Sequence, residues 1–345
     1  MRALRPCSSP PYLAPVPQSS TSTLVAFPRQ TRPRRRLQPF VLASAPAGQR
    51  GRRRSDDDYH ATVRSLNSRG RHKPRKSLGQ HYMLNSSVNE ELVNVAGVGE
   101  GDVVLEIGPG TGSLTNVLIN AGATVVAVEK DPQMAMLVQE RFGSTDRLMV
   151  LQEDFTKCHI HLHLSSFLEK NHMERTPFAK VVSNLPFNIS TEVIKQLLPM
   201  GDIFSDVVLL LQDETASRLA DCSLRTSEYR PINIFVNFYS ADPEYKFKVE
   251  RTNFFPQPNV DAAVIRFKLK PTTEYPKVSS RRSFFSMVSS AFNGKRKMLR
   301  KSLQHICPSG EIEAALSSIG QPVTARPEEL TLDDFVSLHN LIVKV

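Results

Sequence analysis

A glycine-rich segment that directly follows an apolar run could hold a nucleotide-like ligand. Val103–Ile107 has the apolar character of a buried strand, and Gly108, Gly110 and Gly112 follow it at once. The first two glycines let the backbone turn tightly and approach a ligand closely, and Gly112 permits close packing of the next helix. This pattern predicts a cofactor site, although glycines alone are also compatible with a structural turn that binds nothing.

A carboxylate stands where it could bind a ribose. Glu129 ends the next expected strand, 21 residues after Gly108, and can accept hydrogen bonds from both ribose hydroxyls. A dinucleotide fingerprint would require a third glycine at position 113, which is Ser113. Together with the acid at Glu106, this spacing favours S-adenosylmethionine, which has no pyrophosphate to bind.

Asp154 adds a second acceptor after the third expected strand. Its carboxylate could accept a hydrogen bond from the adenine amine of the cofactor, with Phe155 near the ring. The alternative is that Asp154 only caps the N-terminus of a helix. The sequence leaves both interpretations open.

The segment Asn184-Leu185-Pro186-Phe187 follows the fourth expected strand and could bind a flat ring that carries an exocyclic amine. The Asn184 side-chain oxygen and the Leu185 carbonyl can each accept one N–H bond, which favours a pyramidal nitrogen with a free lone pair. Pro186 stiffens the turn, and Phe187 can stack on the base, which contributes roughly 1–3 kcal/mol. An ordinary loop turn is the alternative.

This chemistry requires no titrating base, because the amine that attacks a sulfonium methyl becomes an acidic ammonium and loses its proton afterwards. Orientation and electrostatics would be the main catalytic contributions. The glycine segment and the Asn184–Phe187 segment together predict an enzyme that methylates an adenine.

The pattern of apolar residues predicts an α/β fold, namely a Rossmann-like parallel sheet with helices on both faces, followed by a small C-terminal helical domain. Strands are expected at 103–107, 124–128, 148–151, 180–182 and 207–211, with a further strand or pair within 232–239 and 263–269. Helices are expected at 131–142, 191–198, 281–303 and 311–319. The expected divisions are a leader at 1–60, a catalytic domain at 61–270 and a helical domain at 275–345.

The charge of the chain is concentrated in its first residues. Residues 1–55 contain 11 Arg, no Lys and no acidic residue, whereas residues 56–345 contain 33 basic and 34 acidic residues. The formal net charge of +10 therefore belongs to the leader and is no evidence that the remaining chain binds nucleic acid.

The leader resembles an organelle transit peptide, because it is Arg-rich, rich in hydroxyl residues and free of acids, and has no compact apolar core. Its many prolines would break an amphipathic helix, which favours the chloroplast over the mitochondrion. A basic arm that holds RNA is the alternative. The four scattered cysteines fit a reducing compartment, and no run of 18 apolar residues predicts a membrane span.

From about Lys73 to the C-terminus the chain resembles the KsgA-type rRNA adenine dimethyltransferases, which are related to the Erm resistance enzymes. Besides the two segments above, four blocks carry the resemblance: Lys76–Leu84, Leu210–Arg218, Val249–Asp261 and Ala291–Leu303. The departures are mild; Phe187, for example, stands where the family often has Tyr.

The resemblance also implies roles for individual residues. His81 and Met83 would contact the cofactor, and Phe254 would help to hold the target base. In the last block, Lys295, Arg296 and Lys297 would contact RNA from one face of a basic helix, which makes 275–345 the RNA-contacting domain.

The implied reaction is transfer of methyl groups from S-adenosylmethionine to two adjacent adenosines in the 3′-terminal hairpin loop of small-subunit rRNA, each of which receives two methyls. The implied partner is that rRNA or the assembling small subunit. A loop suits this reaction because its bases are easily unstacked. Two alternatives remain, a non-catalytic assembly or transcription factor on the same fold and an Erm-like enzyme that acts on large-subunit rRNA. The complete set of Glu129, Asp154 and Asn184 favours catalysis.

Two smaller patterns receive a structural interpretation. His159, His161 and His163 alternate with apolar residues and would share one face of a strand, but apart from Cys158 no partner completes a site, so we expect no bound metal. Glu214 and Arg218 are expected to pair on a helix.

Overall fold

The computed structural model describes residues 63, 74–75, 78–170, 178–221, 223–294 and 297–343. The leader prediction for residues 1–60 lies outside the described residues, as do the predicted RNA contacts of Lys295 and Arg296. Among the helices that are described, none is long and apolar enough to cross a membrane.

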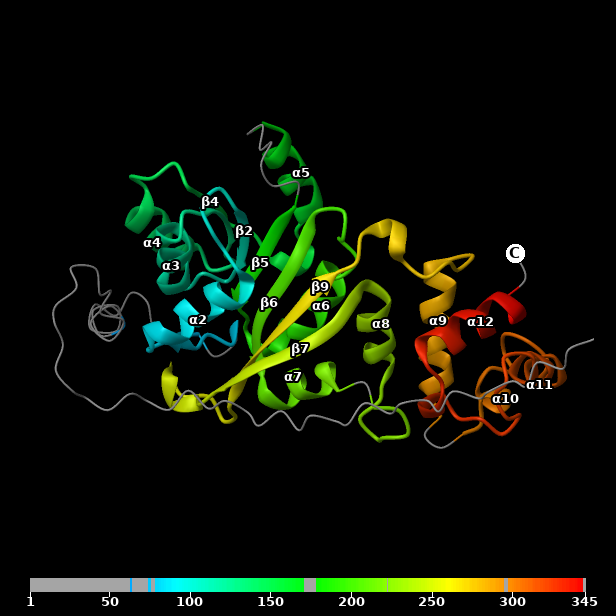
Figure 1. Cartoon of the computed structure of the whole chain (residues 1–345). Coiled ribbons are helices and arrows are strands. Elements are labelled where there is room, and N and C mark those ends of the chain that lie inside the picture. Colours follow the sequence, from blue (N-terminus) through cyan, green and yellow to red (C-terminus); the bar gives the residue numbers. More distant parts are fainter. Residues whose placement is uncertain are drawn as a thin grey trace, which may run out of the picture. The chain divides into compact units, whose positions relative to one another are not determined.

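A seven-stranded sheet carries the fold, with the strand order β4-β3-β2-β5-β6-β9-β7 (Figure 1). The strands are β2 (Val103–Ile107), β3 (Thr124–Val128), β4 (Leu148–Leu151), β5 (Ala179–Asn184), β6 (Phe204–Gln212), β7 (Ser240–Val249) and β9 (Ala262–Leu269).

The sheet is mixed rather than fully parallel, so that part of the prediction was wrong. The strands from β4 to β6 run parallel, but β9 is antiparallel to both β6 and β7. The described connection from β7 to β9 contains no α-helix, whereas parallel neighbours are usually joined by a crossover helix.

Helices cover both faces of the sheet. On one face, Val104 shares a hydrophobic cluster with Leu92 and Leu118, which come from α2 (Ser86–Ala96) and α3 (Ser113–Asn120). On the other face, Leu105 belongs to a cluster that contains, among others, side chains of three further helices. These helices are α5 (Ile160–Lys170), α6 (Ser190–Leu197) and α8 (Pro231–Tyr239). Neighbouring residues of β2 thus point to opposite layers.

Six described α-helices remain, and all of them except α4 (Pro132–Phe142) add side chains to the cluster that contains Leu105. The other five are α7 (Asp213–Ala220), α9 (Arg281–Phe292), α10 (Leu299–Ser302), α11 (Ser309–Ser318) and α12 (Leu332–Ile342). The short 3₁₀ helices are η2 (Phe155–Lys157), η3 (Phe187–Ile189), η4 (Arg251–Asn253), η5 (Thr272–Glu274) and η6 (Pro327–Glu329). Phe238 of α8 packs against Phe284 of α9 with ring centroids 5.3 Å apart, which joins the C-terminal helices to the core.

Residues 232–239 form most of α8, so the expected strand there was wrong. Pro231 begins the helix, and the Arg230 amide donates to the Asn233 side chain across its first turn. The β-branched and aromatic residues of this segment resemble a strand, but Ile234, Val236 and Phe238 are buried in the core. A helix that is surrounded by other elements is apolar on all sides and loses its sequence period.

The single helix expected at 281–303 is divided. The first helix, α9, ends at Phe292, and Gly294 follows in the connection to α10. Lys297 therefore lies between two helices, where its amide donates to the Gly294 carbonyl, and not on one basic helix face.

Candidate active site

The candidate site lies where the chain order of the sheet reverses. From β2 the chain proceeds to β3 and β4 on one side, and it later continues through β5 and β6 on the other. A crevice at the carboxyl ends of the strands is expected at such a switch point. A pocket is found there, and residues that follow β2, β3, β4 and β5 line it.

The glycine loop needs its glycines. Gly110 has φ 54° and Gly112 has φ 78°, a backbone region that other residues rarely adopt. A Cβ atom on Gly112 would lie 2.7 Å from the Phe142 ring of α4. The loop is thus shaped by its own backbone conformation and by close packing, as the sequence predicts.

Glu129 lines the pocket and is held by two backbone amides. Its carboxylate accepts from the Gly110 amide at 3.3 Å and from the Asp131 amide at 2.8 Å. The side chain is buried, and this burial raises the pKa of the carboxyl, while the two amide bonds oppose the rise. The carboxylate is therefore positioned before any ligand arrives.

Asp154 is a helix cap that also lines the pocket, so the capping interpretation is confirmed and the adenine contact stays a prediction. It caps η2 by accepting from the Thr156 amide at 3.1 Å, and it also lines the pocket. Lys130 lies 2.8 Å from its carboxylate, and this contact, followed by the bonds from Thr156, lowers the pKa of Asp154. Asp154 is thus an ionised hydrogen-bond acceptor at the pocket wall.

Glu106 is an acidic residue that is buried at the wall of the pocket. It is 1% exposed, lines the same pocket and accepts a hydrogen bond from the Thr115 hydroxyl at 2.6 Å. Burial raises its pKa from 4.5 to about 8. The sequence showed the acid but not its burial, which depends on α3 packing above the strand.

The four residues Asn184, Leu185, Pro186 and Phe187 all line the pocket. Asn184 ends β5, and the Leu185 amide continues the sheet by donating to the Leu210 carbonyl of β6 at 3.3 Å. Phe187 then starts η3, where its carbonyl accepts from the Ser190 hydroxyl at 3.0 Å. The segment is therefore supported at both ends.

A small two-stranded sheet forms another wall of the pocket. It pairs β1 (Tyr82–Met83) with β8 (Phe254–Phe255) so that Met83 stands opposite Phe254. The His81 ring stacks on Phe187 with centroids 6.0 Å apart. Since a carbonyl can only accept, His81 Nδ1 carries the proton that it donates to the Pro256 carbonyl at 2.6 Å.

The structure thus gathers most of the predicted site residues in one pocket: His81, Met83, Gly108, Gly110, Glu129, Asp154, Asn184, Leu185, Pro186, Phe187 and Phe254. Lys297 does not line it. Gln80, Thr111 and Lys130 line it without having been predicted. Lys130 directly follows Glu129, and this position next to a predicted site residue is the one local feature that could have indicated it.

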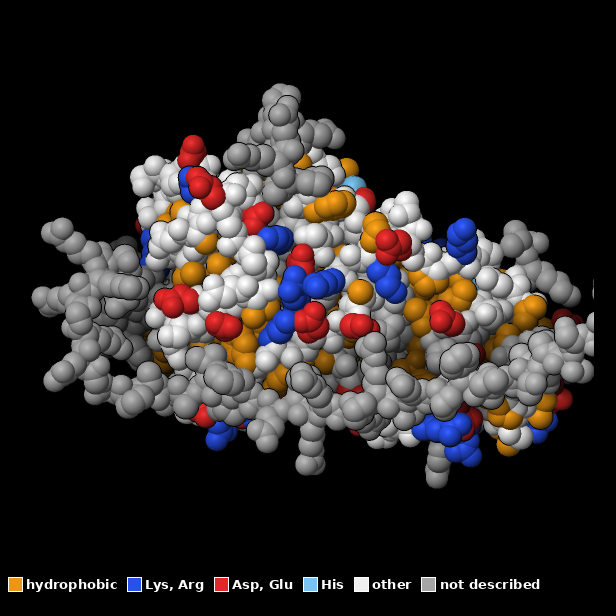
Figure 2. Space-filling model, viewed as in Figure 1, with side chains coloured by type: hydrophobic (Ala, Val, Ile, Leu, Met, Phe, Trp, Pro, Cys, Tyr) orange, Lys and Arg blue, Asp and Glu red, His pale blue; other side chains and the backbone are white. Residues whose placement is uncertain are grey.

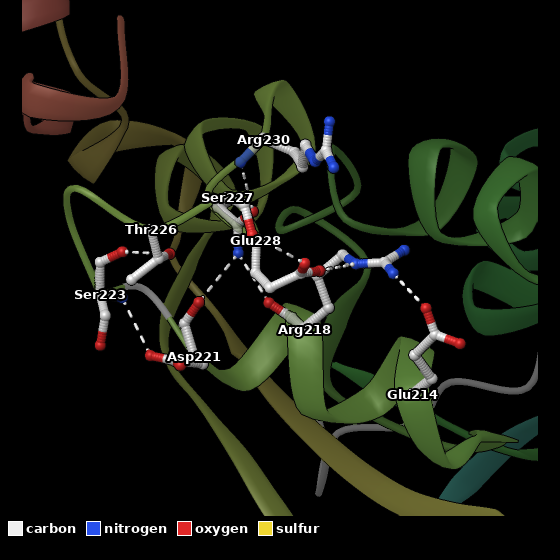
Figure 3. Close-up of polar contacts among 9 residues, drawn as sticks. Glu214, Arg218, Asp221, Ser223, Thr226, Ser227, Glu228 and Arg230 are labelled. Atoms are coloured by element: carbon white, nitrogen blue, oxygen red, sulfur yellow. Dashed lines mark hydrogen bonds and ion pairs between the residues drawn. The ribbon is translucent and has the colours of Figure 1, made fainter.

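Arg218 forms ion pairs that connect α7 with the loop that follows it. Figure 3 shows Arg218 between two carboxylates, with Glu214 at 2.5 Å on the same helix and Glu228 at 3.0 Å in the loop that leads to α8. The expected pairing of Glu214 with Arg218 is confirmed. These contacts hold the connection between α7 and α8.

Acidic and basic side chains are mixed on the face where β7 and β9 lie (Figure 2). Lys248 bridges Asp213 at 3.3 Å and Asp261 at 2.9 Å, and Arg266 pairs with Asp206 at 2.6 Å. Such pairs protect the edge strand of a sheet from joining another chain. This mixed surface is unlike a uniformly basic RNA-binding face.

Comparisons with known proteins agree with this site. The model of the family "Ribosomal RNA adenine dimethylase" matches residues 71–344. The chain is 68% identical over 292 residues to "Ribosomal RNA small subunit methyltransferase, chloroplastic" from Arabidopsis thaliana, with 84% of each chain covered. It is 36% identical to "Ribosomal RNA small subunit methyltransferase A" from Protochlamydia amoebophila, with 77% of this chain and 90% of the relative covered.

Two solved structures support the fold. The match to a dimethyladenosine transferase from Plasmodium falciparum has a TM-score of 0.58 at 22% identity. It covers 74% of this chain and 95% of the Plasmodium falciparum chain. The match to the 23S rRNA methyltransferase ErmE has a TM-score of 0.55 at 22% identity. It covers 75% of this chain and 98% of the ErmE chain. Together with the family match and the 68% identity, these findings show that the chain is an rRNA methyltransferase of the ribosomal RNA adenine dimethylase family.

Proposed function

We propose that this protein transfers methyl groups from S-adenosylmethionine to the exocyclic amines of two adjacent adenosines in the 3′-terminal hairpin loop of small-subunit rRNA. The products are dimethyladenosines, formed during ribosome assembly in the chloroplast stroma. One observation carries the proposal: the segment Asn184–Phe187 and the acidic side chains of Glu106, Glu129 and Asp154 line one pocket. The small subunit and the chloroplast are supported by the name of the relative from Arabidopsis thaliana.

The pocket fits S-adenosylmethionine by the chemistry of its side chains. The Glu129 carboxylate would accept from the ribose hydroxyls, and Asp154, kept ionised beside Lys130, would accept from the adenine amine. His81 and Met83 would form the wall between cofactor and target base. Family membership implies this cofactor, which when bound supplies an electrophilic methyl group on a sulfonium.

The target adenine would lie against Phe187. Its amine would donate one hydrogen bond to the Asn184 side-chain oxygen and one to the Leu185 carbonyl, so that the nitrogen lone pair becomes available for attack. Phe187 would stack on the base, supported from behind by His81, and Phe254 would limit its movement from the β8 side. The proton on the methylated nitrogen would then leave to solvent, so the side chains act by orientation and electrostatics.

The partner would be small-subunit rRNA or the assembling subunit. Contacts of Lys297 and of its neighbours Lys295 and Arg296 with RNA phosphates remain part of this proposal. Each such contact would make binding depend on salt, because it releases counterions. Lys297 is exposed, as a phosphate contact requires.

The test is methyl transfer by the purified protein. Small subunits that lack the modification would be incubated with S-adenosylmethionine that carries a labelled methyl, and the RNA would be digested to nucleosides. We expect the label in dimethyladenosine from the 3′-terminal hairpin. Label in large-subunit rRNA, or small-subunit RNA that is bound without being methylated, would contradict the proposal and favour the Erm-like or the non-catalytic alternative.

A further inference from the structure

Three side chains with metal-ligand atoms meet beside the pocket, on the segment that follows β4. Within the described part of the chain, Glu153, Cys158 and His163 place a carboxylate oxygen, a thiol sulfur and an imidazole nitrogen within 4.8 Å of one another. Glu153 lies between β4 and η2, Cys158 directly follows η2, and His163 belongs to the first turn of α5. The cluster is therefore local in sequence but uses three separate elements.

The secondary structure explains why the sequence did not predict this cluster. Alternation suggested that three histidines share one face of a strand, but residues 160–170 form a helix. On a helix, residues two apart point in different directions. His161 accordingly pairs with Asp202 at 2.9 Å, while His163 turns back to Glu153, with Nε2 3.5 Å from Oε1.

These distances are close to those around a tetrahedral zinc ion. With Zn–N and Zn–O bonds of about 2.0–2.2 Å, two ligand atoms lie roughly 3.3 Å apart, and a sulfur at about 2.3 Å lies roughly 3.5 Å from either of them. The 3.5 Å between His163 and Glu153 already matches this spacing. The remaining pairs of ligand atoms lie within 4.8 Å of each other.

We propose that Glu153, Cys158 and His163 bind a zinc-type divalent cation, with water in the fourth position. The donor set decides the class of metal, because a thiolate with an imidazole suits zinc and related transition metals, whereas magnesium and calcium prefer oxygen ligands. On binding, the cation replaces the thiol proton of Cys158, which leaves to solvent, and no electron is transferred.

The backbone around the cluster is held in place without a metal. The Glu153 amide donates to the Leu151 carbonyl at 3.1 Å, and the Cys158 amide donates to the Phe155 carbonyl at 3.2 Å. Gln196 of α6 donates to the Thr156 carbonyl at 2.8 Å. Three ligands on an ordered backbone lose less entropy on binding than three ligands on a loose loop.

A nucleophilic or redox role for Cys158 fits the structure less well. Such a cysteine requires an accessible thiolate beside positive charge. Cys158 is partly buried and its sulfur lies beside the Glu153 carboxylate, which is a negative rather than a positive neighbour.

The cluster also adjoins the proposed cofactor site. Glu153, Asp154 and Phe155 all line the pocket, so a cation on Glu153 would fix the segment that carries Asp154. The metal proposal does not require this coupling, because the cation can be detected by its binding alone.

Metal binding to the full-length protein tests the proposal. The protein would be freed of metal by a chelator, then titrated with Zn²⁺ in a calorimeter and with Co²⁺ in a spectrophotometer. We expect one ion per chain, a near-ultraviolet band from thiolate to cobalt, and no competition from excess Mg²⁺. Buffers with different ionisation enthalpies should reveal that a proton is released on binding.

Variants assign the ligands. Cys158→Ser and His163→Gln should each lower zinc affinity by more than the roughly 10–100-fold that loss of an outer hydrogen-bond partner causes. His161→Gln, a matched change on the same helix, should leave the affinity unchanged. Circular dichroism would verify folding, and Glu153→Gln, which keeps the side-chain size, would replace any variant that misfolds. Unchanged zinc affinity in Cys158→Ser, or no stoichiometric uptake by the wild-type protein, would overturn the proposal.

Discussion

The Ser183 hydroxyl bonds to both backbone groups of Ile107, accepting from its amide at 2.9 Å and donating to its carbonyl at 2.6 Å. Backbone pairing between β2 and β5 covers Val104 and Leu105 and then stops. One side chain therefore joins the two strand ends from which the glycine loop and the segment Asn184–Phe187 start. The crevice of the site opens directly beyond this junction.

Ser183→Ala should therefore affect both stability and activity. Ser183 is 0% exposed, so the change leaves two buried backbone groups of Ile107 without this partner, at a cost of about 1–3 kcal/mol. We also expect a lower kcat, because Asn184 and Gly108 are each one residue from the broken contact. Denaturant unfolding and steady-state kinetics would measure the two effects.

Ser240→Ala is the matched control, since Ser240 is 1% exposed and donates to the Val236 carbonyl of α8 at 2.8 Å. That carbonyl also accepts a hydrogen bond from the Ser240 amide. The variant should therefore lose less stability than Ser183→Ala, and its kcat should be unchanged. Equal kinetic effects of the two variants would show that Ser183 does not position the site.

Glu129→Gln should weaken cofactor binding more than it weakens the fold. The amide keeps one acceptor for Gly110 or Asp131 but loses the charge that strengthens ribose hydrogen bonds, so we expect a loss of roughly 1–3 kcal/mol in binding free energy. Calorimetry with S-adenosylmethionine would measure it. Glu140→Gln, an exposed position on α4, is the control. Unchanged affinity in Glu129→Gln would reject the ribose assignment.

Glu106 should make stability depend on pH. Burial raises its folded-state pKa to about 8, against 4.5 for an ordinary glutamate. Between these values the unfolded chain has released a proton that the folded chain still holds, so stability should fall as the pH rises through this window. Glu106→Gln cannot ionise and should reduce the slope, which urea unfolding at several pH values would reveal. A slope identical to that of the wild-type protein would mean that Glu106 is ionised in the folded state.

Phe187 should act through its ring. Phe187→Ala should lower kcat/KM by about 5- to 150-fold, the equivalent of roughly 1–3 kcal/mol of stacking. Phe187→Tyr keeps the ring and should retain most of the activity. Steady-state kinetics with the RNA substrate would test this, with Phe178→Ala as a control at an exposed phenylalanine outside the pocket. A Tyr variant as impaired as the Ala variant would argue against stacking.

Some of the fold could be predicted from local patterns. The observed β2, β3 and β4 have the bounds that the sequence predicted, because a short apolar run followed by a turn or a glycine loop is a strong strand signal. Their order along the chain then places Gly108, Glu129 and Asp154 at one edge of the sheet. This local regularity is why the cofactor side of the site was predictable.

Other parts depend on contacts that no local pattern contains. The strand β7 was missed because Ser240–Val249 carries polar and charged residues, which an edge strand tolerates on its open side. Met83 and Phe254 meet only because β1 pairs with β8 across about half of the chain, so composition and spacing alone could not join them. Only the family resemblance assigned both residues to the site.

The most direct test of the account reads the 3′ hairpin of chloroplast small-subunit rRNA in cells that lack this protein. Dimethylation blocks base pairing, so it stops reverse transcriptase during primer extension. We predict that the stop disappears without the protein and returns with the wild-type protein or with Ser240→Ala, but not with Asn184→Ala. A stop that persists without the protein, or that Asn184→Ala restores in full, would contradict the account.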